Sequence, residues 1–216
     1  VPGMGAVSMR APAPSPRASP SPNPLPAGLE NRVWFAQLNG HADGRPQFAA
    51  GTLDGSAVVE LPAGAMPLVG DLGGIIVVEH EGRGAAATSR LALVDLSDAA
   101  VRVLGTVAGS IETGCIVGDT VVASGTSGED GVAPAVLGID RARGTIGTIV
   151  EATRVAEAQN SAGVSRSIVC SPREESVVVD QCLLSDPPKC QATVLDTKDW
   201  STMFVVEDRK STRLNS

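Results

Sequence analysis

Aromatic residues are almost absent from this sequence. Its 216 residues include no tyrosine, two tryptophans and three phenylalanines, although 43% of the residues are hydrophobic. The core must therefore be built from valine, isoleucine, leucine and alanine, and short valine-rich runs favour strands over helices. The 24 glycines and 15 prolines indicate frequent turns. The composition predicts an all-β protein.

Lysine is scarce as well, with three residues in a chain whose net charge is −7. Nucleic acids and anionic membrane surfaces bind to basic patches, so this balance argues against both as partners. The acidity is typical of a surface that keeps a protein soluble. No run of about 18 apolar residues occurs, so we expect no membrane span in this sequence.

The two ends of the sequence differ from its middle. Residues 1–30 are rich in proline and serine and poor in large apolar side chains, which predicts a disordered, extended linker. The last nine residues, DRKSTRLNS, resemble the translation of a common short-read sequencing adapter, and we interpret 208–216 as an artefactual tail. Without that tail the net charge is −9, because it contributes three basic residues and one acid. We therefore expect natural sequence beyond Glu207, and an upstream signal peptide or anchor before Val1 stays open.

An internal repeat organises residues 31–207. Four segments align on one aspartate, which follows an apolar strand and precedes a short polar turn and a second apolar strand. The aspartates lie 41, 45 and 56 residues apart, and each is expected to accept hydrogen bonds from backbone amides of its own turn. These repeat-turn residues are Asp54, Asp95, Asp140 and Asp196.

A second hairpin precedes each of the last three aspartate hairpins. Two hairpins make four antiparallel strands, and four strands every 40 to 55 residues or so are typical of a β-propeller blade. The expected blades cover residues 66–109, 110–153 and 154–206, after a group of three strands within 32–62. The predicted fold is thus a partial β-propeller of about three and a half blades. The strand missing from the first group is expected to follow Glu207.

The hairpin pattern resembles the pyrroloquinoline-quinone-like propeller repeat, which reads approximately Ala-x-Asp-x-x-Thr-Gly-x-x-x-Trp. The segment GIDRARGTIGT keeps Asp140 and Gly144, and VLDTKDWSTMF keeps Asp196 with Phe204 at the tryptophan position. The phrase IVCSPREESVVV is similar to WD-type repeats instead. Both resemblances imply a propeller, although no repeat here keeps the tryptophan that joins neighbouring blades in the first family.

The four cysteines give two different expectations. Cys182 and Cys190 flank a short polar loop at a hairpin, where strand ends bring side chains within bridging distance, so we predict a disulfide. Cys115 and Cys170 lie 55 residues apart against a repeat offset of 56, so their positions are not equivalent, and we expect buried free thiols. One disulfide and a proline-rich linker favour an extracytoplasmic location.

No catalytic motif is evident. The sequence has neither a Gly-x-Ser-x-Gly elbow nor a phosphate-binding loop, and the glycine-rich segment 124–131 lies between strands, where a loop tip is expected. His80 stands between Glu79 and Glu81, which could indicate a metal site but is more typical of a solvated loop. Neither histidine has zinc spacing to a cysteine pair, so no metal and no cofactor are predicted.

The predicted function is that of a non-catalytic propeller module for binding or scaffolding. It would be the extracytoplasmic sensor or interaction domain of a bacterial envelope protein, with an unknown protein or small molecule as ligand. Trp200, in a turn, is a candidate partner contact, with packing over a blade edge as the alternative. The alternative function is a fragment of a quinoprotein-like dehydrogenase or another propeller enzyme, whose active site would lie in blades outside this sequence.

Overall fold

The computed structural model describes residues 29, 31–38, 44–127, 132–155, 163–171, 173, 175–185 and 187–207. Within these ranges the chain forms strands, turns and one short 3₁₀ helix, η1 (Gly84–Ala86), so the predicted all-β class is confirmed. No described helix has the length and apolar character needed to cross a membrane. The tail 208–216 and nearly all of the linker 1–30 lie outside the described residues.

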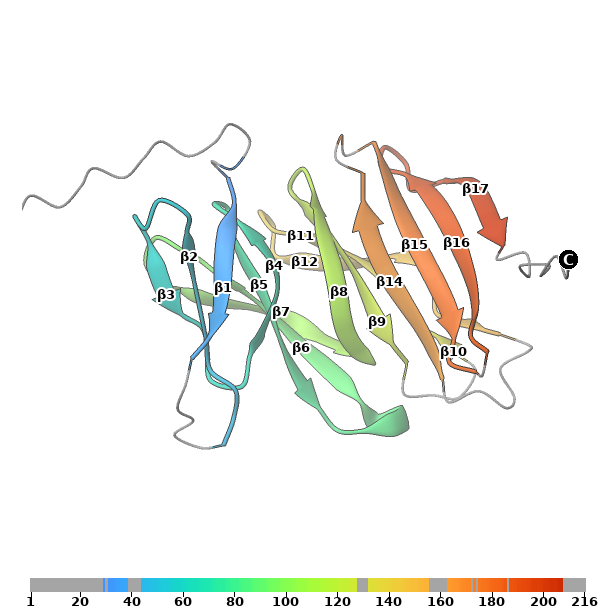
Figure 1. The fold of residues 1–216 in the computed structure, drawn as a ribbon, viewed down its shortest axis with the longest axis horizontal. Coiled ribbons are helices and arrows are strands. Elements are labelled where there is room, and N and C mark those ends of the chain that lie inside the picture. The colour runs from blue at the N-terminus through green and yellow to red at the C-terminus, as the bar shows by residue number, and fades with distance from the viewer. Residues whose placement is uncertain are drawn as a thin grey trace, which may run out of the picture.

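The strands form antiparallel sheets that follow one another in chain order, from the blue end to the red end of Figure 1. Sheet I contains β1 (Val33–Gln37), β2 (Phe48–Thr52) and β3 (Val58–Glu60). Sheet II contains β4 (Met66–Asp71), β5 (Gly74–Glu81), β6 (Thr88–Val94) and β7 (Val101–Ala108).

The second half of the chain repeats the arrangement of sheet II twice. Sheet III contains β8 (Ser110–Val117), β9 (Thr120–Thr126), β11 (Val136–Asp140) and β12 (Thr145–Val150). Sheet IV contains β14 (Val164–Cys170), β15 (Ser176–Leu183), β16 (Lys189–Asp196) and β17 (Thr202–Glu207). Two short strands, β10 (Val132–Ala133) and β13 (Thr153–Arg154), pair with each other. Sheets II, III and IV correspond to the three predicted blades.

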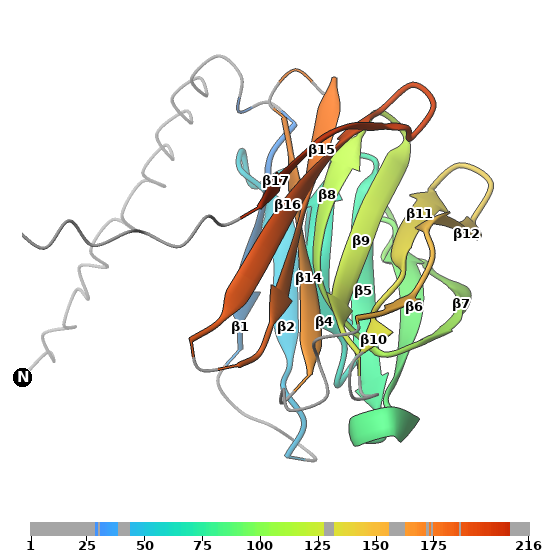
Figure 2. The same ribbon diagram turned by 90° about the vertical axis from the view of Figure 1, so that its right-hand side faces the viewer.

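The first strands of successive sheets lie against one another. β4 contacts β8, and β8 contacts β14. β9 and β14 also share one register pair, Thr126 with Ser165, which connects sheets III and IV into one continuous eight-stranded sheet. Figure 2 looks at the molecule from the side of sheet IV, whose strands stand in front of the other sheets. The sheets are therefore stacked as blades around the strands β4, β8 and β14, which makes the chain a partial β-propeller.

Sheet I lacks its innermost strand among the described residues. The repeat aspartate is the last residue of the third strand in sheet III (Asp140) and in sheet IV (Asp196), and it directly follows the third strand in sheet II (Asp95). Asp54 lies between β2 and β3, so these two strands correspond to the third and fourth of a complete sheet, and β1 corresponds to the second. The structure confirms the predicted group of three strands. The order of these strands shows that the strand equivalent to β4 is the one that sheet I lacks among the described residues.

Each inner sheet is buried on both faces. On β5, Ile75 and Val77 pack toward sheet I, while Ile76 and Val78 pack toward sheet III. A strand with two covered faces is a continuous apolar run, which explains the sequence GIIVV. The core is thus a series of layers between sheets, each built from aliphatic side chains.

The repeat aspartates cap their own turns. In each turn one carboxylate oxygen accepts a backbone N–H two or three residues ahead, at 2.7 to 2.9 Å. The four acceptor–donor pairs are Asp54 with Ser56, Asp95 with Ser97, Asp140 with Arg143, and Asp196 with Lys198. Hydrogen bonds from Thr52 and Ser56 lower the pKa of Asp54 to about 2. The Ser97 hydroxyl and the Arg143 amide lower the pKa of Asp95 and of Asp140, respectively.

Arginines connect neighbouring sheets. Arg141, which follows β11, forms an ion pair with Asp71 of sheet II at 2.5 Å and donates to the Gly118 carbonyl at 2.9 Å. From the other side, Arg102 of β7 donates to the carbonyls of Arg141 and Ala142. These contacts hold the turns of sheets II and III together.

Arg166 of β14 is the most deeply buried of these cations, with 5% of its surface exposed. Its guanidinium donates to the carbonyls of Pro134 and Glu151 at 2.6 and 3.1 Å, and to the Thr153 hydroxyl at 3.0 Å. Its Nε donates to Gln181 at 3.0 Å, and burial lowers its pKa. Arg166 thus joins sheet IV to the segments that flank sheet III.

The aspartate turns generate a pH prediction. A carboxylate whose pKa is lower in the folded state stabilises the fold above its unfolded pKa of about 3.9, and that stability is lost as the pH falls through the folded value. We expect the urea midpoint to drop as the pH goes from about 4 to about 2. The Asp95→Asn variant keeps a side-chain oxygen as acceptor but has one titrating carboxylate fewer. Its urea midpoint should therefore fall less than that of the wild type. An equal fall in both proteins would contradict this account.

The buried arginine generates a second prediction. Arg166→Met should lower the free energy of unfolding by about 3 kcal/mol, because carbonyls that it satisfies lose their donor. The matched control is Arg90→Met, since Arg90 forms a partly exposed ion pair with Glu79 and its loss should cost less than about 1 kcal/mol. Urea denaturation measures both variants. Equal effects would show that Arg166 does not join the sheets.

Candidate functional site

A cleft of about 300 Å³ opens between sheets I and II, where segments distant in the sequence meet. The cleft lies at the end of the strands opposite the repeat-aspartate turns. The turn at Asp71, between β4 and β5, lies at the same end of sheet II as the Asp95 turn, and β5 runs from there to the cleft. The lining residues are Arg45, Pro46, Gly64, Glu79, His80 and Glu81.

Two loops form one wall of this cleft. The Gly64 amide donates to the Pro46 carbonyl at 3.0 Å, and the Gln47 side chain donates to the Leu61 carbonyl at 2.8 Å, so the segments before β2 and β4 are held together. Gly64 has a φ of +84°, and a Cβ there would lie 3.3 Å from the Cδ of Arg45. Glycine therefore provides the turn and leaves room for the arginine stem.

The opposite wall carries an imidazole with a defined proton position. His80 Nδ1 lies 3.1 Å from Ser89 Oγ. The Ser89 hydroxyl donates its single hydrogen to the Gly109 carbonyl at 2.8 Å and accepts the Ile111 amide at 2.8 Å. Nδ1 must then be the donor toward Ser89, which leaves Nε2 of the neutral ring as an acceptor.

Ser89 itself is structural. It is fully buried, and its hydrogen and both lone pairs are used by Gly109, Ile111 and His80. The His80–Ser89 pair therefore does not have the arrangement of a base and its nucleophile, because the serine oxygen is neither accessible nor free to lose its proton to the imidazole. Its effect is to orient the ring at the mouth of the cleft.

The cleft contains charges of both signs. The Glu79 carboxylate forms an ion pair with the Arg90 guanidinium at 2.9 Å. Arg45 and Glu81 are exposed, and within the described part of the chain neither forms an ion pair. One cation, one anion and one imidazole acceptor thus face the same space. Such a set can orient a small polar ligand that carries charges of both signs.

The structure pairs Cys182 and Cys190 of sheet IV as a disulfide, as predicted. Cys182 on β15 and Cys190 on β16 are direct register partners, with Cα atoms 4.1 Å apart and an S–S bond of 2.04 Å. This bond closes the hairpin that carries the polar loop. It lies within one sheet, so it does not connect blades.

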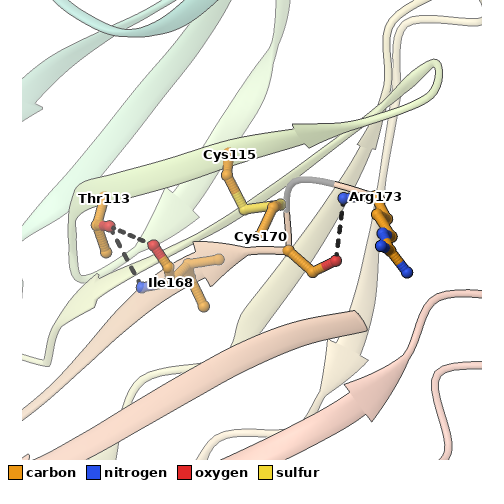
Figure 3. Close-up of a disulfide and its surroundings, with 6 residues drawn as sticks. Thr113, Cys115, Ile168, Cys170 and Arg173 are labelled. Atoms are coloured by element: carbon orange, nitrogen blue, oxygen red, sulfur yellow. Dashed lines mark hydrogen bonds between the residues drawn. A yellow bond between two sulfur atoms is a disulfide. The ribbon is translucent and has the colours of Figure 1, made fainter. Parts of the chain in front are cut away.

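The expectation of free thiols at Cys115 and Cys170 is wrong. The two residues form a disulfide between β8 and β14, with Cα atoms 5.8 Å apart, as Figure 3 shows. Beside it, the Thr113 hydroxyl accepts the Ile168 amide at 3.3 Å and lies 3.4 Å from the Ile168 carbonyl. Sheets III and IV are therefore joined covalently at their inner strands.

The prediction assumed that cysteines at non-equivalent positions of two repeats could not form a bond with each other. Side chains alternate between the two faces of a strand, so an offset of one residue changes the face. Cys115 points toward sheet IV, and Cys170, displaced by one residue from the equivalent position, points back toward sheet III. Residues at equivalent positions would point the same way and could not bridge neighbouring sheets.

The tryptophans both pack on the protein. Trp200 lies in the turn between β16 and β17 with a φ of +61°, and it contacts the layer between sheets III and IV while remaining partly exposed. The Trp34 indole donates to the Thr52 carbonyl at 3.0 Å. A partner contact through Trp200 stays a prediction.

Sequence reasoning identified one side of the cleft and missed the other. His80 and its two glutamates were recognised as a charged cluster and interpreted as a solvated loop, and the structure places them at an accessible strand end. Arg45 and Gly64 were not recognised, because they come from separate loops and no local pattern connects them. His41 lies outside the described residues.

Comparisons with known proteins assign neither a family nor an activity to this chain. No family model and no curated protein matches the sequence. A candidate 6-phosphogluconolactonase from Bacteroides fragilis matches 87% of this chain over 70% of its own length, with 9% identity and a TM-score of 0.42. A similar candidate from Bacteroides uniformis matches 84% of the chain over 69% of its own, with 10% identity and a TM-score of 0.41. The AtxE2 isopeptidase with Astexin3-dC4 bound matches 81% over 26% of its own length, with 11% identity and a TM-score of 0.41.

The disulfides generate a prediction that separates the two bonds. On the loop-entropy model, a closed loop of 55 residues stabilises by about 4 kcal/mol and one of 8 residues by about 2.5 kcal/mol. The double variant Cys115→Ser/Cys170→Ser should thus lose more stability than Cys182→Ser/Cys190→Ser, as measured by urea denaturation. Peptide mapping without reductant should find both pairs linked. Free thiols at Cys115 and Cys170 in the native protein would overturn the assignment.

Proposed function

We propose that this propeller domain is a non-catalytic binding module and that its ligand is a free amino acid or short peptide held in the His80 cleft. The observation that carries the proposal is the convergence of Arg45 and Glu81, which have no ion-pair partner among the described residues, on one cleft. Arg45 would bind the carboxylate of the ligand, and Glu81 would bind its ammonium group. His80 Nε2 would accept a further hydrogen bond.

The size and location of the cleft support the same class of ligand. A volume of about 300 Å³ is at the small end of the range for ligand pockets and suits a dipeptide or a large amino acid. The ring of His80 is already fixed by Ser89, so little ordering is required on binding. The walls of the cleft come from the adjacent sheets I and II.

An extracytoplasmic location is part of this proposal. All four cysteines of the sequence are paired in disulfides, which persist in oxidising compartments. A domain outside the cytoplasm that binds amino acids or peptides would act as a sensor or recognition domain of the cell envelope. Two disulfides support that location more strongly than the one that was predicted.

The binding proposal is tested by NMR titration of the ¹⁵N-labelled protein with single amino acids and dipeptides at millimolar concentration. We expect shifts at the amides of Gly64, His80 and Glu81. Arg45→Ala and Glu81→Gln should each weaken binding about tenfold or more, since each removes a charge-assisted hydrogen bond.

The matched control is Arg32→Ala, an exposed arginine outside the cleft, which should leave the affinity unchanged. Titrations without amide shifts at the cleft would contradict the binding site. Cleavage of the dipeptides, visible in the same spectra, would contradict the non-catalytic assignment.

A further inference from the structure

A second, smaller groove adjoins the His80 cleft. It has a volume of about 40 Å³ and lies on the face of sheet II that packs on sheet I. The ion pair of Glu79 and Arg90 borders it on one side, and the rest of its lining is aliphatic. The aliphatic lining residues are Pro62, Ala65, Val77, Ala92, Val101 and Val103.

The register of sheet II explains why this groove is apolar and open. Val77, Ala92 and Val103 are register partners across β5, β6 and β7, so their side chains form one row on the same face. Val77 and Ala92 are buried, whereas Val103 is 50% exposed and Val101, on the same face of β7, is 49% exposed. The equivalent of β7 in sheet I is β3, which has three residues against eight in β7. The groove therefore has a buried apolar floor and an uncovered apolar wall.

Strand β5 connects the groove with the cleft. Val77, Glu79 and Glu81 alternate along β5, so they belong to the face that packs on sheet I. Val77 lines the groove, Glu81 lines the cleft, and Glu79 lines both. Arg90 neutralises Glu79 at this junction. A ligand held by Arg45 and Glu81 can thus extend along β5 into the groove without passing an unpaired charge.

We infer that the ligand of the His80 cleft is a dipeptide with one small branched aliphatic side chain, such as valine, and that the groove binds this side chain. This specificity depends on the proposed function, in which Arg45 and Glu81 bind the charged ends of the ligand. A space of about 40 Å³ holds about three groups of the size of a water molecule, since each needs roughly 10 to 15 Å³. The three carbons of a valine side chain match that space, and an aromatic ring exceeds it. Binding removes apolar surface of the ligand and of Val101 and Val103 from water.

NMR titrations of the ¹⁵N-labelled protein with glycylvaline, valylglycine and glycylglycine test this specificity. We expect the better of the two valine dipeptides to bind about tenfold more tightly than glycylglycine, because it buries additional apolar carbons. It should shift the amides of Ala92 and Val103 as well as those of Gly64 and Glu81. Glycylglycine should shift the amides of Gly64 and Glu81 alone.

Two variants change the groove at residues that do not line the cleft. Val101→Thr/Val103→Thr keeps the shape of both side chains and adds hydroxyl groups, and Ala92→Val fills part of the groove. Each should reduce the preference for the valine dipeptide to about threefold or less and leave the affinity for glycylglycine unchanged. The matched control is Val169→Thr, since Val169 is 61% exposed on sheet IV, outside the groove, and should leave the preference intact. Circular dichroism checks that each variant is folded.

The outcomes separate this specificity from the proposed function. Equal affinities for all three dipeptides, with amide shifts in the cleft, would overturn the role of the groove and leave the proposed function standing. Titrations in which no dipeptide shifts the cleft amides would overturn both. A valine preference that persists in both groove variants would place the side chain elsewhere and would also overturn the inference.

Discussion

Contact between neighbouring sheets is the constraint on which this structure depends. A strand such as β5 carries valine or isoleucine on both faces, so a sheet that stood alone would leave both faces in contact with water. Packing sheet on sheet in series satisfies both faces, and it does so with aliphatic side chains because almost no aromatic residues are present. Two of the three layers are also joined by a specific contact, which is an ion pair between sheets II and III and a disulfide between sheets III and IV.

The candidate site depends on the same contact. Arg45 and Gly64 belong to the loops of sheet I, and His80 and Glu81 belong to β5 of sheet II, so the cleft exists only while these two sheets are packed. Ser89 of β6 connects the site to the next layer, because it bonds His80 on one side and the Gly109–Ile111 segment before and within β8 on the other. The orientation of the imidazole is thus set by two sheets together.

The sequence predicted the structural features that repeat along the chain and that depend on residues close to one another in the sequence. The recurring aspartates located the hairpins between the third and fourth strands, and the second hairpin before each of the last three gave four strands per sheet. It could not predict which face of one sheet meets the next, because that depends on the register between blades. The Cys115–Cys170 bond, the carbonyl ligands of Arg166 and the two-loop wall of the cleft all depend on that register.

Hydrogen–deuterium exchange of the wild type and of the Cys115→Ser/Cys170→Ser variant tests most directly whether the sheets stabilise one another, because the variant keeps the Cys182–Cys190 bond of sheet IV. If contact between sheets is the dominant constraint, removing the Cys115–Cys170 bond should speed exchange in β8 and in β14–β17 together, including amides far from either cysteine. Faster exchange confined to the residues beside the cysteines, with β15 and β16 unchanged, would show that each sheet is stable by itself and would contradict this account.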